Sequence, residues 1–135
     1  MSLEKALATA QTALPECVAV GYIDMSTGML LSVKTTDSHP NEVLDLLAAA
    51  TADLFQGPNV VAIERMFKRA RGISDDNNEH YFLELVVFSK NLLHVFLRGK
   101  KHPDHATVFV CRANANVGMA LSKARTALAS IEAGV

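Results

Sequence analysis

Residues 82–111 contain three apolar runs in close succession: Phe82-Leu-Glu-Leu-Val-Val-Phe88, Leu92-Leu-His-Val-Phe-Leu97 and Ala106-Thr-Val-Phe-Val-Cys111. Each run has the length of a β-strand, is rich in β-branched and aromatic residues, and is bounded by turn residues. Lys90-Asn91 has the length of a two-residue hairpin loop, so the first two strands are predicted to be antiparallel neighbours. Apolar side chains occupy both faces of the first run, which predicts that both of its faces are covered. The segment therefore indicates a helix–sheet–helix sandwich.

The flanking sequence supplies the remaining elements. Pro15 ends a short helix whose apolar residues recur at helical spacing, and Gly28 closes a turn between two further strands. A long helix ends at Gly57-Pro58, and an amphipathic helix follows the three apolar runs. The predicted helices are residues 3–14, 40–56 and 117–132, and the additional strands are residues 17–23 and 29–33.

Residues 59–72 are ambiguous between helix and strand. Val60, Ile63 and Phe67 keep helical spacing, Pro58 stands where a helix begins, and basic residues crowd the last turn before Gly72. A strand over residues 64–70 is the alternative, although apolar and polar residues alternate poorly there. The pattern favours a helix.

The helix over residues 40–56 is more apolar than one docked face requires. Its polar residues fall on a narrow stripe, whereas a helix packed on a sheet typically has an apolar stripe a little over ~100° wide. Burying a large aliphatic side chain contributes ~1.5–3 kcal/mol, so a second apolar partner is expected. Another copy of the chain is the simplest candidate, which predicts a homodimer.

Composition limits the class of protein. The chain of 135 residues is predicted to form a single domain, residues 1–135, and its net charge of −1 gives no global field for nucleic acid or an anionic membrane. Cys17 and Cys111 lie inside apolar runs, which is typical of buried thiols in a reducing compartment. No apolar run reaches the length of a membrane span, and no secretory signal is recognisable. We expect a cytoplasmic protein without a membrane partner.

No motif indicates catalysis, a cofactor or a metal. His102-Pro-Asp-His105 offers two imidazoles and a carboxylate, but a metal site needs three or four convergent ligands, and this proline-containing stretch is more typical of a solvated loop. His94, inside a strand, is expected to be a hydrogen-bonded structural residue. Neither a glycine-rich phosphate loop nor a nucleophile with an activating base is present. The sequence therefore predicts a protein that is not an enzyme.

Two basic clusters are candidates for binding a partner. One lies in residues 59–72 and the other follows the run that ends at Leu97. Such runs are most often solvated faces, and nucleic acid would usually require interleaved aromatic residues as well. An acidic protein surface is the preferred ligand. The predicted partner-binding residues are Arg65, Lys68, Arg69, Arg71, Arg98, Lys100 and Lys101.

Two passages carry a resemblance to a known family. The hairpin Val20-Gly-Tyr-Ile-Asp-Met-Ser-Thr-Gly-Met-Leu-Leu is similar to the opening strand–Asp–x–x–Gly–strand of the roadblock/dynein light chain family, a branch of the profilin-like folds. Val108-Phe-Val-Cys-Arg-Ala-Asn-Ala-Asn-Val-Gly118 resembles the same family's passage from last strand to last helix. The resemblance covers nearly the whole chain as an order of elements.

The resemblance implies a profilin-like three-layer α/β/α sandwich. Its five-stranded antiparallel sheet would have the order 2-1-5-4-3, with the second helix on one face and the first and last helices on the other. It also implies a homodimer in which second helices pack together and edge strands, around residues 81–88, form one continuous sheet. The predicted dimer interface is Val43, Leu44, Leu47, Leu54, Tyr81 and Leu83.

The function implied is that of a non-catalytic homodimeric scaffold, a regulator or partner of a small Ras-like GTPase or signalling complex. A different class of function is the alternative, namely a small-molecule or nucleotide sensor with a ligand groove between helices and sheet. An unrecognised enzyme is a more distant third.

Overall fold

The computed structural model describes residues 2–36, 41–74 and 80–135, with residues 41–43 described by their backbone alone. This part of the chain contains four helices and five strands, and their bounds agree closely with those predicted. They are α1 (Leu3–Ala13), β1 (Cys17–Asp24), β2 (Met29–Thr35), α2 (Asn41–Gln56), α3 (Pro58–Ala70), β3 (Glu84–Phe88), β4 (Leu92–Arg98), β5 (His105–Arg112) and α4 (Val117–Ala133).

The strands form one antiparallel sheet in the order β2-β1-β5-β4-β3, which confirms the predicted fold class and strand order. β1 and β5 pair at its centre, where Cys17 lies opposite Cys111 and Val20 opposite Phe109. β3 and β4 form the predicted hairpin: Lys90-Asn91 is its turn, and the Ser89 backbone N–H donates to the Leu92 carbonyl at 2.9 Å. β3 is consequently an edge strand.

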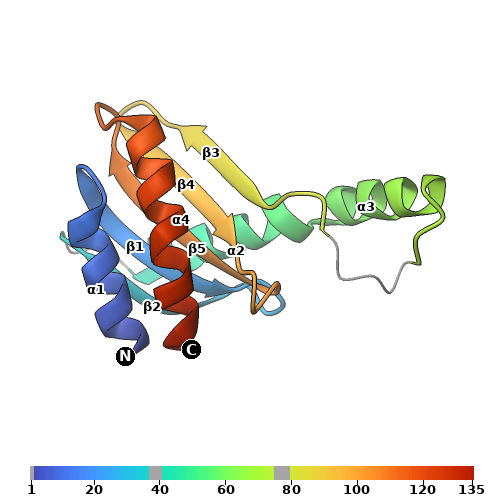
Figure 1. Cartoon of the computed structure of the whole chain (residues 1–135), viewed down its shortest axis with the longest axis horizontal. Helices are drawn as coiled ribbons and strands as arrows, with labels where there is room; N and C mark the ends of the chain where they lie inside the picture. Colours follow the sequence, from blue (N-terminus) through green and yellow to red (C-terminus); the bar gives the residue numbers. More distant parts are fainter. Residues whose placement is uncertain (1, 37–40, 75–79) are drawn as a thin grey trace.

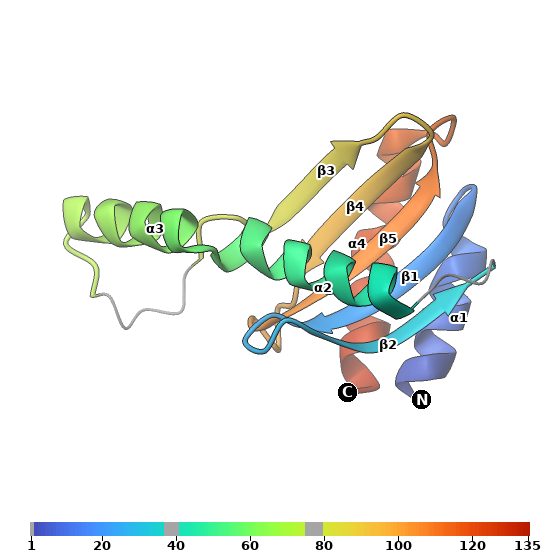
Figure 2. The ribbon, with the colours of Figure 1, turned by 180° about the vertical axis from the view of Figure 1, so that it is seen from behind.

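Helices cover the two faces of the sheet as expected. α1 and α4 lie side by side on one face, and α2 crosses the other (Figures 1 and 2). The core under α1 and α4 includes Leu7, Tyr22 and Phe109, whereas that under α2 includes Phe55 and Phe96. Because strand residues point alternately to the two faces, successive residues of β4 and β5 join opposite cores.

α3 settles the ambiguity at residues 59–72 in favour of a helix. Gly57 is its N-cap and Pro58 its first residue, where the missing N–H of proline costs nothing. α3 projects beyond the sheet, roughly in line with the end of α2, and forms an arm at one end of the molecule (Figures 1 and 2). The chain then returns through residues 80–83 to the beginning of β3.

β3 corrects the expectation that both faces of this strand are covered. Val86, Val87 and Phe88 are exposed, with 57 % of Phe88 accessible to solvent. The strand has apolar residues on both faces, as the sequence indicated, but α2 packs over β1 and β2 rather than over β3. Within this chain, the edge of the sheet therefore keeps an apolar surface in contact with water.

Candidate interaction surface

Large apolar side chains are exposed on α2, on α3 and along β3, the strand at the edge of the sheet. Leu46 is 70 % exposed and Met66 69 %, values unusual for such large apolar residues on structured elements. We call this set the apolar flank. It consists of Leu46 and Leu54 on α2, Ile63, Met66 and Phe67 on α3, Tyr81 and Leu83 in the returning segment, and Val86, Val87 and Phe88 on β3.

The apolar flank arises because α2 uses one narrow side to dock on the sheet. Ala48, Thr51 and Phe55 are fully buried there, and the Thr51 hydroxyl donates to the carbonyl of Leu47 at 2.8 Å. The three residues are spaced three and four apart, which is the period of one helix face. Leu46 and Leu54 lie off that face and remain exposed.

The predicted interface residues fall into three groups. Leu54, Tyr81 and Leu83 are exposed members of the apolar flank, whereas Leu44 and Leu47 are half-buried. The side chain of Val43 lies outside the described residues. The structure places Leu54 on α2 and Tyr81 and Leu83 in the segment before β3, and their role at an interface stays a prediction.

Leu46, Met66 and Phe88 are large exposed residues that the predicted interface omits. The signal for Leu46 was present, since it lies off the helix face defined by Ala48, Thr51 and Phe55. Two observations together indicate that Phe88 is exposed. Its run is apolar on both faces, and β3 lies at the edge of the sheet, where it has only one neighbouring strand.

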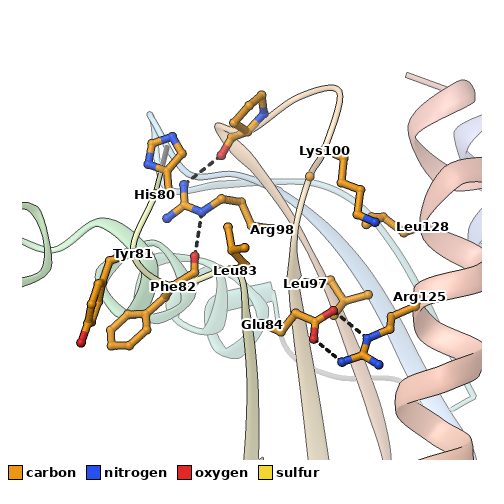
Figure 3. Close-up of a pocket in the computed structure, with 12 residues that line it drawn as sticks. His80, Tyr81, Phe82, Leu83, Glu84, Leu97, Arg98, Lys100, Arg125 and Leu128 are labelled. Atoms are coloured by element: carbon orange, nitrogen blue, oxygen red, sulfur yellow. Dashed lines mark hydrogen bonds and ion pairs between the residues drawn. The ribbon is translucent and has the colours of Figure 1, made fainter. Parts of the chain in front are cut away.

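Arg98 is the clearest correction among the predicted partner-binding residues. It is 4 % exposed, and its guanidinium donates four hydrogen bonds of 2.9 Å, to the carbonyl oxygens of Phe55, Phe82 and Pro103 and to Oε1 of Gln56. Figure 3 shows it between Phe82 and the loop after β4. Burial lowers the pKa of Arg98, against the opposing charges of Glu64 and Asp104. Arg98 therefore links the end of α2, the segment before β3 and the β4–β5 loop of its own chain, and its charge is not accessible to a partner.

The other basic residues are not gathered into one patch. Arg65, Arg69 and Arg71 are exposed on or just after α3, but Lys68 on the same helix is buried. Lys100 and Lys101 are exposed in the loop between β4 and β5. Their backbone N–H groups, with that of His102, donate to the buried carboxylate of Glu132 at 2.7–2.9 Å. The two clusters thus belong to separate parts of the molecule, the arm and the β4–β5 loop.

A groove of about 980 Å³ lies between the edge of the sheet and α4 (Figure 3). Leu83, Leu97 and Leu128 give it apolar walls. Across it, the Arg125 guanidinium donates two hydrogen bonds, of 2.6 and 2.8 Å, to the Glu84 carboxylate. This arginine lowers the pKa of Glu84, against a smaller opposing effect of burial. The groove offers an apolar wall with a charged rim.

Histidine and cysteine side chains form no recognisable reactive centre. The rings of His102 and His105 stack with centroids 5.3 Å apart, and Nδ1 of His105 lies 2.7 Å from the hydroxyl of the buried Tyr22. Across residues 2–36, 44–74 and 80–135, no three His, Cys, Asp or Glu side chains are grouped so as to hold a metal ion. Cys111 is buried and Cys17 half-buried, both as free thiols.

One segment of the described chain has the length and composition of a membrane span. It is Leu44–Ala70, a stretch of 27 residues that joins α2 and α3 and contains an 18-residue window with a mean hydropathy of 1.3, so the sequence expectation of no such segment needs correction. Gly57 interrupts it, and three of its side chains are fully buried against or beside the sheet. Five of its large apolar side chains remain exposed, namely those of Leu46, Leu54, Ile63, Met66 and Phe67.

Comparison with known proteins identifies the fold. No protein-family model matches the sequence, and no curated protein matches it. The chain is similar in structure to a roadblock/LC7 domain from Streptomyces avermitilis, with a TM-score of 0.66 and 12 % identity over 98 % of this chain and 97 % of that one. For MglB of Myxococcus xanthus the TM-score is 0.68, with 13 % identity over 97 % and 93 %. For a structure described as MglB with tetrameric arrangement it is 0.67, with 19 % identity over 97 % and 88 %.

The molecule is a profilin-like α/β/α sandwich built on a five-stranded antiparallel sheet. More particularly, it has the roadblock/LC7 fold, as the resemblance of its hairpin and its last strand indicated. At these low identities the likeness concerns the fold.

Proposed function

We propose that this protein is a non-catalytic, homodimeric interaction module of the cytoplasm, which regulates or scaffolds a small Ras-like GTPase or another signalling protein. The observation that carries the proposal is the apolar flank on α2, α3 and β3. Exposed apolar patches of this kind usually mark protein interfaces, because water contact with so many large side chains is unfavourable.

A second copy of the chain is the partner best suited to the apolar flank. β3 is an edge strand with unpaired backbone groups, and α2, on one face of the same sheet, exposes Leu46 and Leu54. A two-fold axis beside β3 would pair two such edges into one sheet and bring the two α2 helices together. The structure described as MglB with tetrameric arrangement shows that a protein of this fold self-associates.

Light scattering at micromolar concentration tests the dimer. The chain has a mass of 14.6 kDa, and we expect twice that value in solution. Leu54→Asp should yield monomers, because it places a charge in the apolar flank. Met119→Asp is the matched control, since Met119 is also exposed but lies on α4, on the opposite face of the sheet. A stable wild-type monomer would contradict the proposal.

The GTPase partner is tested separately. A small Ras-like GTPase from the same genome, loaded with GDP or with a non-hydrolysable GTP analogue, should bind the wild-type protein in a titration calorimeter. Neutralising Arg65, Arg69 and Arg71 to alanine should weaken that binding through lost electrostatic steering. The control is neutralisation of three exposed lysines elsewhere, namely Lys5, Lys34 and Lys123.

The groove beside α4 supports the alternative function of a small-molecule or nucleotide sensor. Its volume and apolar walls fall within the range of ligand sites. A nucleotide and metabolite panel tests it, because a ligand that binds the native state raises the melting temperature by mass action. A rise of several degrees that Leu83→Glu abolishes would favour the sensor over the scaffold.

A further inference from the structure

α3 is an amphipathic helix whose polar side faces its own chain. The buried Glu64 carboxylate accepts a hydrogen bond from the Tyr81 backbone N–H at 3.2 Å, and it lies 3.5 Å from Nδ1 of His80. The rings of Phe67 and Tyr81 stack with centroids 5.2 Å apart. Amphipathic helices normally bury their apolar side. Here Ile63 and Met66 form an exposed stripe together with Phe67, about half of which stays exposed while its ring stacks on Tyr81.

On the α2 side of the sheet, β3 has an apolar surface that its own chain covers only in part, because Leu85 is half-buried against the core under α2 whereas Val87 is exposed. Leu85 pairs with Phe96 and Val87 with His94, and Phe96 belongs to the core under α2. Leu85 and Val87 therefore point to the same side of the sheet as α2. Val87 is exposed, and Nδ1 of the neighbouring His94 is buried with no hydrogen-bond partner in the described part of the chain. This end of β3 is suited to receive a covering element.

In a dimer, the arm formed by α3 would extend toward the end of β3 of the second copy, where the apolar surface is uncovered. α3 extends beyond the sheet close to the beginning of β3 (Figures 1 and 2). A two-fold axis beside β3 makes the two edge strands antiparallel, so the beginning of one lies next to the end of the other. If the axis is perpendicular to the sheet, the α2 sides of both sheets also face the same way. Each α3 then lies near Val87 and the β3–β4 turn of the other copy.

We infer that α3 is an exchanged arm: its stripe of Ile63, Met66 and Phe67 packs on Leu85 and Val87 of a second copy of this chain, reciprocally across the two-fold axis. The occupant is a second copy because each chain carries both complementary halves: an exposed apolar stripe on α3, and an apolar, partly uncovered surface on the edge strand β3. This inference rests on the proposed homodimer and specifies the contact that α3 adds to it.

Dimer affinity tests the arm. Met66→Asp should raise the dimer dissociation constant at least tenfold in sedimentation equilibrium, because the charge would enter a dry contact. Met119→Asp, the same substitution at an exposed methionine on α4, should leave the constant unchanged. Met66 is largely exposed in the single chain, so circular dichroism and thermal melting of the Met66→Asp variant should match those of the wild type.

Disulfide trapping tests the position of the arm independently. A Met66→Cys chain is mixed with a Val87→Cys chain that carries a size tag, and the mixture is oxidised mildly with copper phenanthroline. We expect a covalent product of mixed mass that reducing agent removes. Replacing Met66→Cys by Met119→Cys should eliminate that product, and wild-type protein gives the background from Cys17 and Cys111.

The outcomes separate this inference from the proposed function. If Leu54→Asp dissociates the dimer while Met66→Asp does not and no mixed product forms, the homodimer stands and the exchanged arm is wrong. A wild-type protein that is monomeric at micromolar concentration overturns both. A weakened Met66→Asp dimer together with the mixed product establishes the exchanged arm.

Discussion

Nη2 of Arg98 donates a 2.9 Å hydrogen bond to the carbonyl oxygen of Phe55, and the guanidinium carbon lies 5.2 Å from the centroid of the Phe55 ring. The same guanidinium also donates to the carbonyl oxygens of Phe82, two residues before β3, and of Pro103 in the β4–β5 loop. One buried side chain thus joins the end of α2 to both segments. It fixes the position from which the arm leaves the sheet.

Arg98→Lys should be strongly destabilising. A lysine ammonium cannot reproduce the fork that satisfies four acceptors, and each buried acceptor left unpaired costs ~1–3 kcal/mol. We expect the free energy of unfolding, measured by urea denaturation, to fall by about 3 kcal/mol. Arg112→Lys, at an exposed arginine of β5, is the control and should change it little. Equal effects of both substitutions would contradict this role of Arg98.

Glu132→Gln should release the β4–β5 loop from α4. The Glu132 carboxylate accepts three backbone N–H groups at 2.7–2.9 Å, and a glutamine would turn an NH₂ group toward donors. Hydrogen bonds to charged groups contribute ~1.5–3 kcal/mol, so we expect a loss of about 2 kcal/mol in unfolding free energy. Hydrogen exchange at Lys100 and His102 should accelerate. Glu16→Gln, at a surface carboxylate 3.7 Å from Arg112, should have a much smaller effect.

Stability should decrease on mild acidification. Burial lowers the pKa of His94; burial and then the charge of Arg98 lower that of His80. The unfolded chain therefore binds protons at the usual imidazole pKa of about 6.5, whereas the folded chain resists them until a lower pH. Stability is full above that value and falls below it. Thermal melts between pH 7.5 and 5.5 should show this decrease, and His94→Leu with His80→Asn should reduce it. A melting temperature that rises on acidification would contradict the expectation.

Two glycine substitutions should act in opposite directions. A Cβ added at Gly57 would lie 2.6 Å from the carbonyl oxygen of Asp53, so Gly57→Ala must shift the junction of α2 and α3 and should cost about 2 kcal/mol. A Cβ at Gly118 meets nothing closer than 3.5 Å, and alanine is the better helix former. Gly118→Ala should therefore stabilise α4 by about 0.5 kcal/mol. Paired urea titrations measure both, and stabilisation by Gly57→Ala would exclude the close contact.

The fold could be predicted from the sequence because its signals are local. The apolar runs, the Lys90-Asn91 turn and Pro58 at a helix start depend on neighbouring residues, and the structure confirms each of them. The resemblance supplied the strand order, which such local signals do not determine.

Arg98 could not be placed from the sequence, because its acceptors at Phe55 and Phe82 are distant in the chain. The sequence around a basic residue next to Lys100 and Lys101 looks the same whether its side chain is solvated or buried. The prediction that both faces of β3 are covered was wrong for a related reason. A strand that is apolar on both faces has the same sequence pattern whether the covering element belongs to its own chain or to another chain. For α3, the helical spacing of Ile63 and Phe67 was correct, but the pattern could not show that this side faces away from its own sheet.

The central pairing of β1 with β5 has a consequence for biosynthesis. β1 is the first strand to leave the ribosome, and one of its two neighbours in the sheet is β5, the last strand. The middle of the sheet therefore cannot form until β5 has been made. Pairing between such distant segments slows folding, and apolar segments exposed in the meantime favour aggregation. Until then, the nascent β3–β4 hairpin and α2 have no completed sheet to pack on, so their apolar side chains stay in contact with water while the chain is being made.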